Sequence, residues 1–250
     1  MTKLKGILLT QGMHGMISQV EGLAKALNIE FIHEKIELNG FWKMIPPRFT
    51  PVKKFVFKNN IEKNFDIVIS CGRKSIIPSI YLKKKYKNKI INIHIQDPKV
   101  SPKNFDFIVA PEHDGLDGAN ILKSKGAIHY LREDELENNK NYFGKNQIIV
   151  PNVDKKAYLS SLKLADHIVV TCDSTSMISE AAITGKPIYI AQMPPIKRNY
   201  RFKKFFELFK SLNIVKDLEN SVVEWNYKKL NETDRISSYI KEKLKNYDFS

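Results

Sequence analysis

Short continuous runs of apolar, mostly β-branched residues recur along the chain, and a small polar turn ends each of them. Three such runs occupy residues 66–72, 106–114 and 166–174. Continuous apolar residues, as opposed to alternating ones, are typical of strands that are buried on both faces. Helix-like stretches lie between the runs, at residues 75–87 and 175–184. This alternation of strand and helix predicts βαβ units around a parallel sheet, and therefore an α/β fold.

The remaining apolar segments fit the same scheme. Further strands are expected near residues 5–9, 30–36, 90–95, 127–131, 147–150 and 187–191. Further helices are expected at residues 18–27, 202–212 and 234–245. A polar stretch at residues 132–145 predicts a linker or an exposed loop. We therefore expect two domains, one at residues 1–140 and one at residues 141–250 that includes the terminal helices.

The charge balance favours anionic partners. The 250 residues include 41 basic and 27 acidic side chains, which gives a formal net charge of +14. Nucleic acid, phosphate-bearing ligands and acidic membrane surfaces all suit such an excess. However, only six of the basic residues are arginine, and lysine, asparagine and isoleucine are abundant, as codon bias in an AT-rich genome would produce. Because arginine is the usual reader of base edges and phosphates, nucleic acid is disfavoured as a partner.

Cysteine usage and hydropathy indicate a reducing compartment. Cys71 and Cys172 lie far apart, which excludes a Cys-x-x-Cys zinc site. Each ends an expected strand, either as a thiol nucleophile or as a small, partly buried residue. The first apolar run is too short for a signal peptide, and no stretch approaches the roughly 18 apolar residues of a spanning helix. We expect a cytoplasmic protein, with peripheral contact at the inner face of the membrane left open.

One irregular segment, Gly40–Asn60, mixes aromatic and basic residues. Its aromatic residues include Trp42, Phe49, Phe55 and Phe57, and its basic residues are Lys43, Arg48, Lys53, Lys54 and Lys58. This mixture indicates a surface that touches anionic lipid. The alternative is a packed loop whose aromatic side chains fill the core.

Ligands of open parallel sheets bind at the carboxyl ends of the strands, where this chain carries most of its unusual residues. After the first strand, Gly12 and Gly15 permit a close approach of the backbone, and a helix begins there. The loop is neither Gly-x-Gly-x-x-Gly nor a P-loop, so a dinucleotide site or an ATPase is disfavoured. His14 within it is either a general base or an exposed loop histidine.

Two further strand ends carry polar residues. Gly72 and Arg73 precede Ser75 at a helix start, where they hold a phosphate or carboxylate unless Ser75 is only a helix cap. Asp97 follows the expected strand at residues 90–95. Three titratable residues, Glu112, His113 and Asp114, end the apolar run at residues 106–114. The run is too tight for all three to ligate one metal, so acid–base or substrate-binding work is expected instead.

The sharpest pattern follows the strand that ends at Cys172. Ser174, Thr175 and Ser176 form a cluster of hydroxyl side chains at a helix start, and Glu180 follows about one turn later. The hydroxyls and the positive helix end suit a pyrophosphate, and Glu180 suits the vicinal hydroxyls of a ribose. Helix capping alone explains the hydroxyls but does not require the glutamate.

Several of these motifs occur together in an order that is familiar. The series comprises Gly12-Met-His-Gly15, Gln19, Gly22-Leu-Ala24, Ser70-Cys-Gly-Arg73, Gln96-Asp-Pro98, Phe105-Asp106, Pro111-Glu-His-Asp114, Gly126-Ala-Ile-His129, residues 173–181 and Thr184-Gly-Lys-Pro187. With them the chain resembles the bacterial relatives of the plant "elongated mitochondria" family of mitochondrial fission. That family looks like two-domain GT-B glycosyltransferases, which implies two Rossmann-like lobes with parallel sheets, the first on the acceptor side and the second on the donor side.

The resemblance also implies roles for residues. Residues 176–187 are similar to the donor-binding helix of nucleotide-sugar transferases that build peptidoglycan and lipid A, which implies that Glu180 holds the donor ribose. The implied donor-binding residues are Ser174, Thr175, Ser176, Met177 and Glu180. The residues expected to face the diphosphate or the acceptor are Gly12, Gly15, Gln19, Gly72, Arg73, Asp97 and His113.

The chain departs from the family pattern in its second domain, which we expect to be shortened by several elements before the donor helix. Only residues 142–151 separate the first domain from the donor-helix unit, so part of the usual diphosphate cradle is missing. The leading hypothesis is metal-independent sugar transfer from a nucleotide-diphosphate sugar, without a cofactor, to an envelope or lipid-linked glycan. His14, Glu112 or Asp114 would be the base. The alternatives are a non-catalytic adaptor on a membrane surface with a vestigial nucleotide site, and a nucleotide-sugar epimerase.

Overall fold

The computed structural model describes residues 4–138, 150, 152, 154–193, 200–219 and 223–247. The chain divides into two compact units, the first formed by Met1–Tyr130 with Glu232–Ser250 and the second by Leu131–Asn231. The boundary expected between residues 140 and 141 lies outside the described residues, as do residues 147–149 of the strand expected at residues 147–150. Each unit is built on a parallel sheet flanked by helices, which confirms the predicted α/β class with two Rossmann-like lobes.

The first unit contains a six-stranded parallel sheet with the order β2-β1-β3-β4-β5-β6. Its strands are β1 (Lys5–Thr10), β2 (Glu30–Lys35), β3 (Ile67–Cys71), β4 (Ile91–Ile95), β5 (Phe107–Pro111) and β6 (Ile121–Ser124). Every residue of β3 and β4 is buried. Strands in the middle of such a sheet are covered on both faces, which is why their sequences are continuously apolar.

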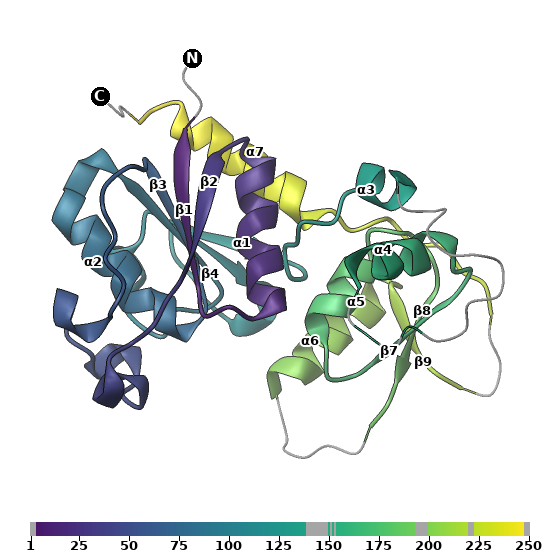
Figure 1. Cartoon of the computed structure of the whole chain (residues 1–250). Helices are drawn as coiled ribbons and strands as arrows, with labels where there is room; N and C mark the ends of the chain where they lie inside the picture. The colour runs from purple at the N-terminus through teal and green to yellow at the C-terminus, as the bar shows by residue number, and fades with distance from the viewer. Residues whose placement is uncertain are drawn as a thin grey trace. The chain divides into compact units, whose positions relative to one another are not determined.

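Helices cover both faces of this sheet (Figure 1). On one face, α1 (His14–Ala26) and α7 (Glu232–Leu244) bury apolar side chains in a common core with the strands. On the other face, α2 (Ile76–Tyr86) packs with Val56 and Phe57 from the segment that precedes β3. We expected the terminal helix in the second domain, whereas its apolar residues complete the core of the first unit.

Short 3-10 helices interrupt the connections of the first unit. They are η1 (Gly40–Lys43), η2 (Pro47–Phe49), η3 (Lys54–Val56), η4 (Arg73–Ser75), η5 (Lys87–Lys89), η6 (Pro102–Asn104) and η7 (Glu112–Asp114). The strand expected at residues 127–131 does not form, although Ile128 is buried there. Instead, the His129 backbone N–H donates to Thr233 Oγ1 (3.0 Å), and the Thr233 hydroxyl donates to the His129 carbonyl (2.9 Å). The segment therefore satisfies its backbone against α7 and not against a strand.

The second unit is smaller. Its described residues form a three-stranded parallel sheet, β7 (Ile168–Thr171), β8 (Ile188–Ala191) and β9 (Val215–Asp217), in that order. Its helices are α3 (Glu133–Asn138), α4 (Lys155–Leu164), α5 (Thr175–Ala181) and α6 (Tyr200–Ser211). Phe205 and Phe209 pack together in its core with ring centroids 4.1 Å apart. Among the helices described in either unit, none combines the length and apolar character needed to cross a bilayer.

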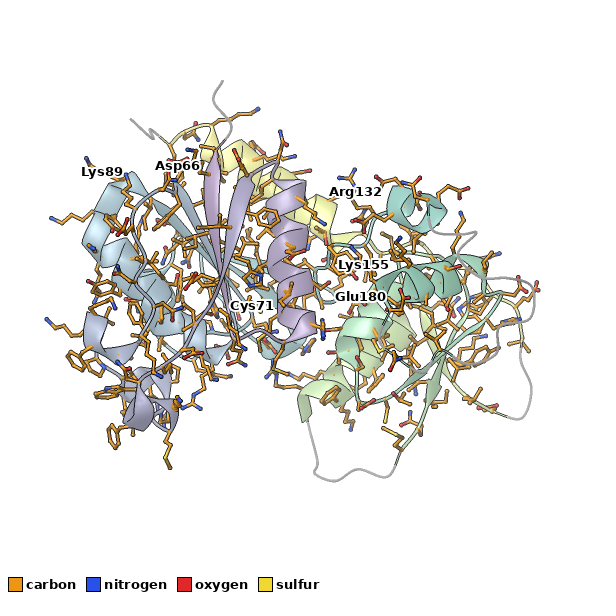
Figure 2. All side chains as sticks on the ribbon, in the orientation of Figure 1. Asp66, Cys71, Lys89, Arg132, Lys155 and Glu180 are labelled. Carbon is orange, nitrogen blue, oxygen red and sulfur yellow. The ribbon has the colours of Figure 1, made fainter. Side chains whose placement is uncertain are left out.

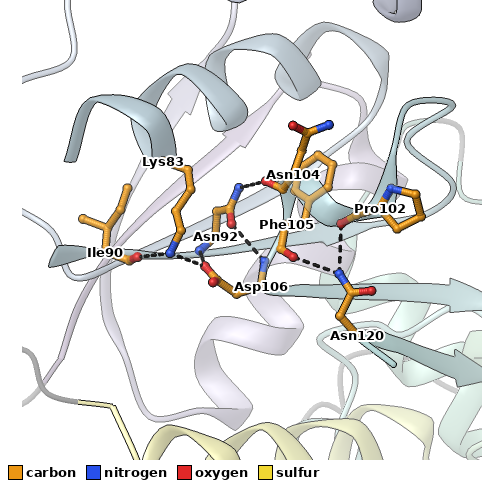
Figure 3. A network of polar contacts seen from close by, with 8 residues as sticks. All are labelled: Lys83, Ile90, Asn92, Pro102, Asn104, Phe105, Asp106 and Asn120. Carbon is orange, nitrogen blue, oxygen red and sulfur yellow. Dashed lines mark hydrogen bonds and ion pairs between the residues drawn. The ribbon is translucent and has the colours of Figure 1, made fainter. Parts of the chain in front are cut away.

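A polar network at the amino ends of β4 and β5 holds these strands in register (Figure 3). The Asp106 carboxylate accepts a hydrogen bond from the Asn92 backbone N–H (2.8 Å) and forms an ion pair with Lys83 Nζ (2.7 Å). The buried Asn92 side chain completes the network. Its Oδ1 accepts from the Asp106 N–H (3.0 Å), and its Nδ2 donates to the Asn104 carbonyl (2.9 Å). These contacts satisfy polar groups that would otherwise be buried without partners.

Similar contacts occur on both sides of this network. The Asp66 carboxylate, at the amino end of β3 (Figure 2), accepts a hydrogen bond from the Lys5 N–H at 2.9 Å. Asn120 Nδ2 donates to the carbonyls of Pro102 (2.9 Å) and Phe105 (2.8 Å). The aspartates that begin the first two apolar runs are therefore register residues at the amino edge of the sheet.

Replacing Asn92 with alanine should destabilise the first unit by about 2–4 kcal/mol, because it leaves a small cavity and removes two side-chain hydrogen bonds at a buried position. The matched control is Asn104→Ala. That residue is partly exposed and its side chain bonds only its own turn, so the loss should stay below about 1 kcal/mol. Urea unfolding followed by circular dichroism measures both changes. Equal effects of the two substitutions would contradict the assignment of Asn92 to the register network.

Candidate functional site

The strand order of the first unit identifies where a ligand would bind. The chain leaves β1 toward β2 on one side and continues from β3 to β6 on the other, so the direction of winding reverses between β1 and β3. In open α/β sheets, ligands bind in the crevice at the carboxyl ends of the strands beside such a switch point. The loops that begin at Gln11 and Gly72 flank this position.

The loop after β1 has a backbone that requires glycine. Gly12 has a φ of +87°, which side chains other than glycine rarely adopt, and its N–H donates to Thr10 Oγ1 at 3.1 Å. The Thr10 hydroxyl also bonds His33 Nε2 at 2.8 Å. Thr10 and His33 were not expected at the site, because a threonine at a strand end and a histidine in an edge strand carry no motif of their own.

Helix α1 starts directly after this loop. Met13 is its N-cap and makes no side-chain capping bond, and the first turn has no acidic residue. The amides of Met16 and Ile17 already bond the Met13 carbonyl, so those of His14 and Gly15 precede the first intrahelical bonds. The His14 side chain is exposed at this positive helix end. The His14 imidazole is therefore accessible to solvent beside the Gly12 loop.

Gln19, which was expected to face the ligand, lies elsewhere. It is 5% exposed on the inner face of α1, and its Oε1 lies 4.0 Å from Cys71 Sγ. Both side chains belong to the core between α1 and β3. The structure therefore does not bring Gln19 together with Gly12 and His14 at the loop surface.

The loop after β3 adjoins the loop after β1. Gly72 has φ +89° and ψ 161°, and a Cβ at this position would lie 2.6 Å from Met16 Sδ of α1. Ser75 follows at the N-cap position of α2 but makes no capping bond, since its hydroxyl donates to the Gly72 carbonyl (2.7 Å). Arg73 donates to the Ile45 carbonyl (2.7 Å), which ties its guanidinium to the loop between β2 and β3. Arg73 therefore has a contact within the protein, and its expected role toward a phosphate or carboxylate stays a prediction.

The ends of β4 and β5 carry the remaining expected residues of the first unit. The Asp97 carboxylate accepts the Lys99 backbone N–H (2.8 Å) and pairs with the Lys99 ammonium. Glu112 is exposed, whereas the side chains of His113 and Asp114 are only 9% and 1% exposed. His113 Nε2 lies 3.6 Å from Asp114 Oδ1. Glu112 is therefore the carboxylate of this group that a ligand reaches most easily. No cluster of three or more metal-ligating side chains occurs among the described residues.

In the second unit, the hydroxyl cluster lies where β7 leads into α5. Ser174 is the N-cap, and its hydroxyl accepts the Met177 N–H at 3.4 Å. The Ile178 amide makes the first intrahelical bond to the Ser174 carbonyl (3.2 Å), so the amides of Thr175 and Ser176 precede it. By helical spacing, Ser176, Met177 and Glu180 share one face of α5. The capping interpretation is therefore correct for Ser174, and it leaves the other hydroxyls to be explained.

Glu180, labelled in Figure 2, is held by a residue of the preceding helix. It is 8% exposed, and its Oε2 accepts a hydrogen bond from the Tyr158 hydroxyl of α4 at 2.8 Å. Tyr158 also lines a groove of about 250 Å³ together with Val169, Met177 and Ala181. Tyr158 was missed from the sequence because its relation to Glu180 depends on how α4 packs against α5. A carboxylate that is oriented by a tyrosine beside an apolar groove can receive hydroxyl donors from a sugar.

The residues that follow α5 hold its end through hydrogen bonds. The Thr184 hydroxyl donates to the Ala181 carbonyl (2.7 Å) and accepts the Lys186 N–H (3.2 Å), while Gly185 adopts φ +76°. Lys186 Nζ donates to the Lys163 carbonyl at the end of α4, and burial lowers the pKa of this ammonium. The Thr-Gly-Lys-Pro segment therefore ends the helix and joins α5 to α4.

The two cysteines differ in environment. Cys71 is fully buried (Figure 2), and burial raises the pKa of its thiol, so it remains protonated and cannot act as a nucleophile at neutral pH. Cys172 is half-buried, and its sulfur accepts the Met193 N–H at 3.4 Å. The buried-residue interpretation is thus correct for Cys71.

His94 lies near the carboxyl end of β4. It is fully buried, and its Nδ1 lies 2.9 Å from Ser70 Oγ. Loss of hydration lowers the pKa of His94 from 6.5 to about 3, although the nearby Asp97 carboxylate opposes this shift. The folded protein therefore keeps a neutral imidazole under conditions in which the unfolded chain would bind a proton.

This difference predicts an acid-sensitive stability. Above pH 6.5 the stability that neutral His94 contributes is complete, and it is lost as pH falls from 6.5 toward about 3. In the wild type, the loss should reach up to about 1.4 kcal/mol per pH unit below pH ~6. His94→Gln should reduce this slope, as measured by urea unfolding between pH 7 and pH 4.5. Identical slopes in both proteins would show that another group causes the acid sensitivity.

The sequence of the chain is similar to those of one family of known proteins. A family model described as "Mitochondrial fission ELM1" matches residues 14–147 and 140–244. A protein of Rickettsia prowazekii (strain Madrid E) called "Uncharacterized protein RP120" is 38% identical over 91 residues, which is 35% of this chain and 25% of that protein. "Mitochondrial fission protein ELM1" of Arabidopsis thaliana is 32% identical over 90 residues, 35% of this chain and 21% of that protein. The match therefore spans a quarter of the first relative and about a fifth of the second. No solved structure matches the chain.

Proposed function

Because the chain belongs to the mitochondrial fission ELM1 family, we propose that it is a GT-B-like glycosyltransferase whose substrate is a nucleoside diphosphate sugar. The observation that carries this proposal is the placement of Glu180. This carboxylate is nearly buried, is oriented by Tyr158, and shares a helix face with Ser176 and Met177. Its position after a parallel strand is where α/β sheets bind nucleotides.

The donor would bind the second unit through its ribose and diphosphate. The ribose hydroxyls would donate hydrogen bonds to the Glu180 carboxylate, whose Oε2 also accepts one from the Tyr158 hydroxyl. The diphosphate would accept hydrogen bonds from Thr175 and Ser176 at the positive end of the helix. Met177, which is 43% exposed, would pack against the sugar or the base. The nucleotide sugar is a substrate in this scheme, and the transfer requires no cofactor.

The transfer itself needs a leaving group and a base. The acceptor hydroxyl oxygen would form a bond with the anomeric carbon while the bond from that carbon to the diphosphate breaks. The negative charge that develops on the diphosphate would be stabilised by the amides and hydroxyls at the start of α5. His14 would take the acceptor proton, since its imidazole is exposed beside the Gly12 loop. Glu112 is the alternative base, because it is exposed while Asp114 is buried.

The acceptor in this proposal is an envelope or lipid-linked glycan, and the protein would act from the inner face of a membrane. The first unit would bind the acceptor at its β1/β3 switch point through the loops of Gly12 and Gly72. Gly12 is exposed with a positive φ, so a ligand would approach its backbone closely, whereas Gly72 is buried against Met16 of α1.

A second candidate function is a non-catalytic adaptor that keeps a nucleotide site without turnover. The small second sheet favours it, because its described residues supply three strands where the first unit has six. Fewer strands leave fewer loops with which to surround a diphosphate. An adaptor would bind a nucleoside diphosphate but would not release it from a sugar conjugate. Turnover of the sugar conjugate therefore distinguishes the transferase from the adaptor.

Calorimetric titration with UDP, GDP, ADP, CMP and their sugar conjugates tests the proposal. One diphosphate should bind the wild type, and Glu180→Ala should weaken it at least about tenfold, because a charge-assisted hydrogen bond is lost. The matched control is Glu133→Ala in the same unit, whose exposed side chain should leave binding unchanged. Tyr158→Phe keeps the carboxylate and should change binding less than Glu180→Ala. Absence of binding up to millimolar concentration, or equal binding by the Glu180 variant, would refute the donor site.

A further inference from the structure

The connection from β2 to β3 contains an unusual surface, formed by residues 40–58 and called here the aromatic loop. It consists of η1, η2 and η3 with short links between them. Arg73, directly after β3, donates to the Ile45 carbonyl, so the loop adjoins the carboxyl edge of the sheet. Figure 1 draws these turns at the end of the first unit where β1 terminates, away from the two chain termini. The loop therefore lies beside the proposed acceptor site of the same unit.

The apolar side chains of the loop divide into two groups. Val56 and Phe57 are buried in the core, and Trp42 packs partly against it. Four others are exposed to solvent: Phe41 is 67% exposed, Met44 82%, Phe49 65% and Phe55 58%. The packed-loop interpretation is thus correct for the first group only. Four large apolar side chains exposed on one short segment form the kind of patch that marks a docking surface.

Hydrogen bonds within the aromatic loop hold its backbone in one conformation. The Asn39 N–H donates to the Val56 carbonyl (2.9 Å), and Asn39 Nδ2 donates to the Phe55 carbonyl (2.5 Å). Leu38 and Phe57 form an antiparallel bridge that closes the base of the loop. The Thr50 hydroxyl donates to the Pro46 carbonyl (3.0 Å). The backbone of the loop therefore needs little ordering before the loop docks, which favours binding.

The charges of the loop are of one sign. No aspartate or glutamate occurs between residues 38 and 61, whereas five cations do, and all five are exposed: Lys43, Arg48, Lys53, Lys54 and Lys58. The Arg48 guanidinium lies 4.5 Å from the ring centroid of Phe49. Cations are thus interleaved with exposed aromatic side chains. Such an arrangement suits a surface that is anionic at the top and apolar just below, which describes an acidic bilayer.

We propose that the aromatic loop docks the first unit onto an anionic lipid bilayer. Phe41, Met44, Phe49 and Phe55 insert into the boundary between headgroups and acyl chains, and the lysines pair with lipid phosphates. Docking through this loop brings the carboxyl edge of the first sheet close to the membrane. If the proposed function holds, a lipid-linked acceptor is then within reach, but the docking itself depends only on the loop.

Trp42 provides a reporter inside the loop, because the chain has two tryptophans and the other, Trp225, lies in the second unit. The protein is the full chain with Trp225→Phe, mixed with vesicles of phosphatidylcholine alone or with 30–40% phosphatidylglycerol, roughly the charge of an acidic membrane. We expect a blue shift of Trp42 fluorescence and co-sedimentation with the anionic vesicles only. Binding should weaken as salt rises, because the lysine contacts are screened.

Two pairs of variants separate insertion from charge. Phe41→Ser with Met44→Ser should lower the vesicle partition coefficient more than about tenfold, whereas Ile32→Ser, at a residue 63% exposed on β2, should leave it unchanged. Lys43→Ser with Lys53→Ser should lower it about 25-fold, since each basic residue near an anionic surface contributes about fivefold. The control, Lys84→Ser with Lys103→Ser, removes exposed lysines outside the loop and should have a much smaller effect.

Several outcomes would overturn the proposal. One is failure of anionic vesicles to bind the wild type, and another is equal loss of binding in the loop and control variants. Self-association that depends on Phe41 and Met44, seen by light scattering without lipid, would assign the patch to a second copy of the chain. None of these outcomes bears on nucleotide binding by the second unit, so failure here and failure of the proposed function are distinguishable.

Discussion

In the first unit, the Asp106 carboxylate joins the Asn92 amide and the Lys83 ammonium at the amino ends of two neighbouring strands. The central strands are apolar on both faces, so burial alone does not distinguish one register from a slipped one. Charge-assisted hydrogen bonds do, because a slip would leave the partly buried carboxylate and the buried Asn92 side chain without partners. Since the amino edge is closed in this way, the opposite edge is where the loops can carry polar groups for a ligand.

Both units present such groups by the same local device, in which a buried strand passes through a polar turn into a helix. In the first unit the turn contains Gly12, whose left-handed backbone brings the start of α1 beside β1. In the second unit Ser174 caps α5, and Tyr158 from α4 orients Glu180 one turn further on. A helix N-terminus provides amides for an anion, while the glutamate provides an acceptor for hydroxyls. In the proposed function, the helix start and the glutamate of the second unit bind the diphosphate and the ribose of the donor.

The sequence predicted the parallel sheets because continuous β-branched runs such as residues 67–71 have few other structures open to them. It predicted the cap at Ser174 because hydroxyls before an apolar helical pattern are a local signal. Local signals could not show that α7 returns to the first unit, since its apolar face fits any sheet. They also could not show that Tyr158 meets Glu180, that Gln19 is buried, or that the aromatic loop directs Phe57 inward and Phe55 outward. Those placements depend on contacts between segments that are distant in the sequence.

The central claim is that the start of α5 and Glu180 form the nucleotide site. Amide-resolved NMR of the full chain, titrated with the tightest-binding nucleoside diphosphate, tests it most directly. The account predicts that the largest shift changes fall on residues 174–180 and on Tyr158, and that they vanish in Glu180→Ala while the rest of the spectrum is kept. Changes spread over exposed lysines, or centred on another segment, would contradict it.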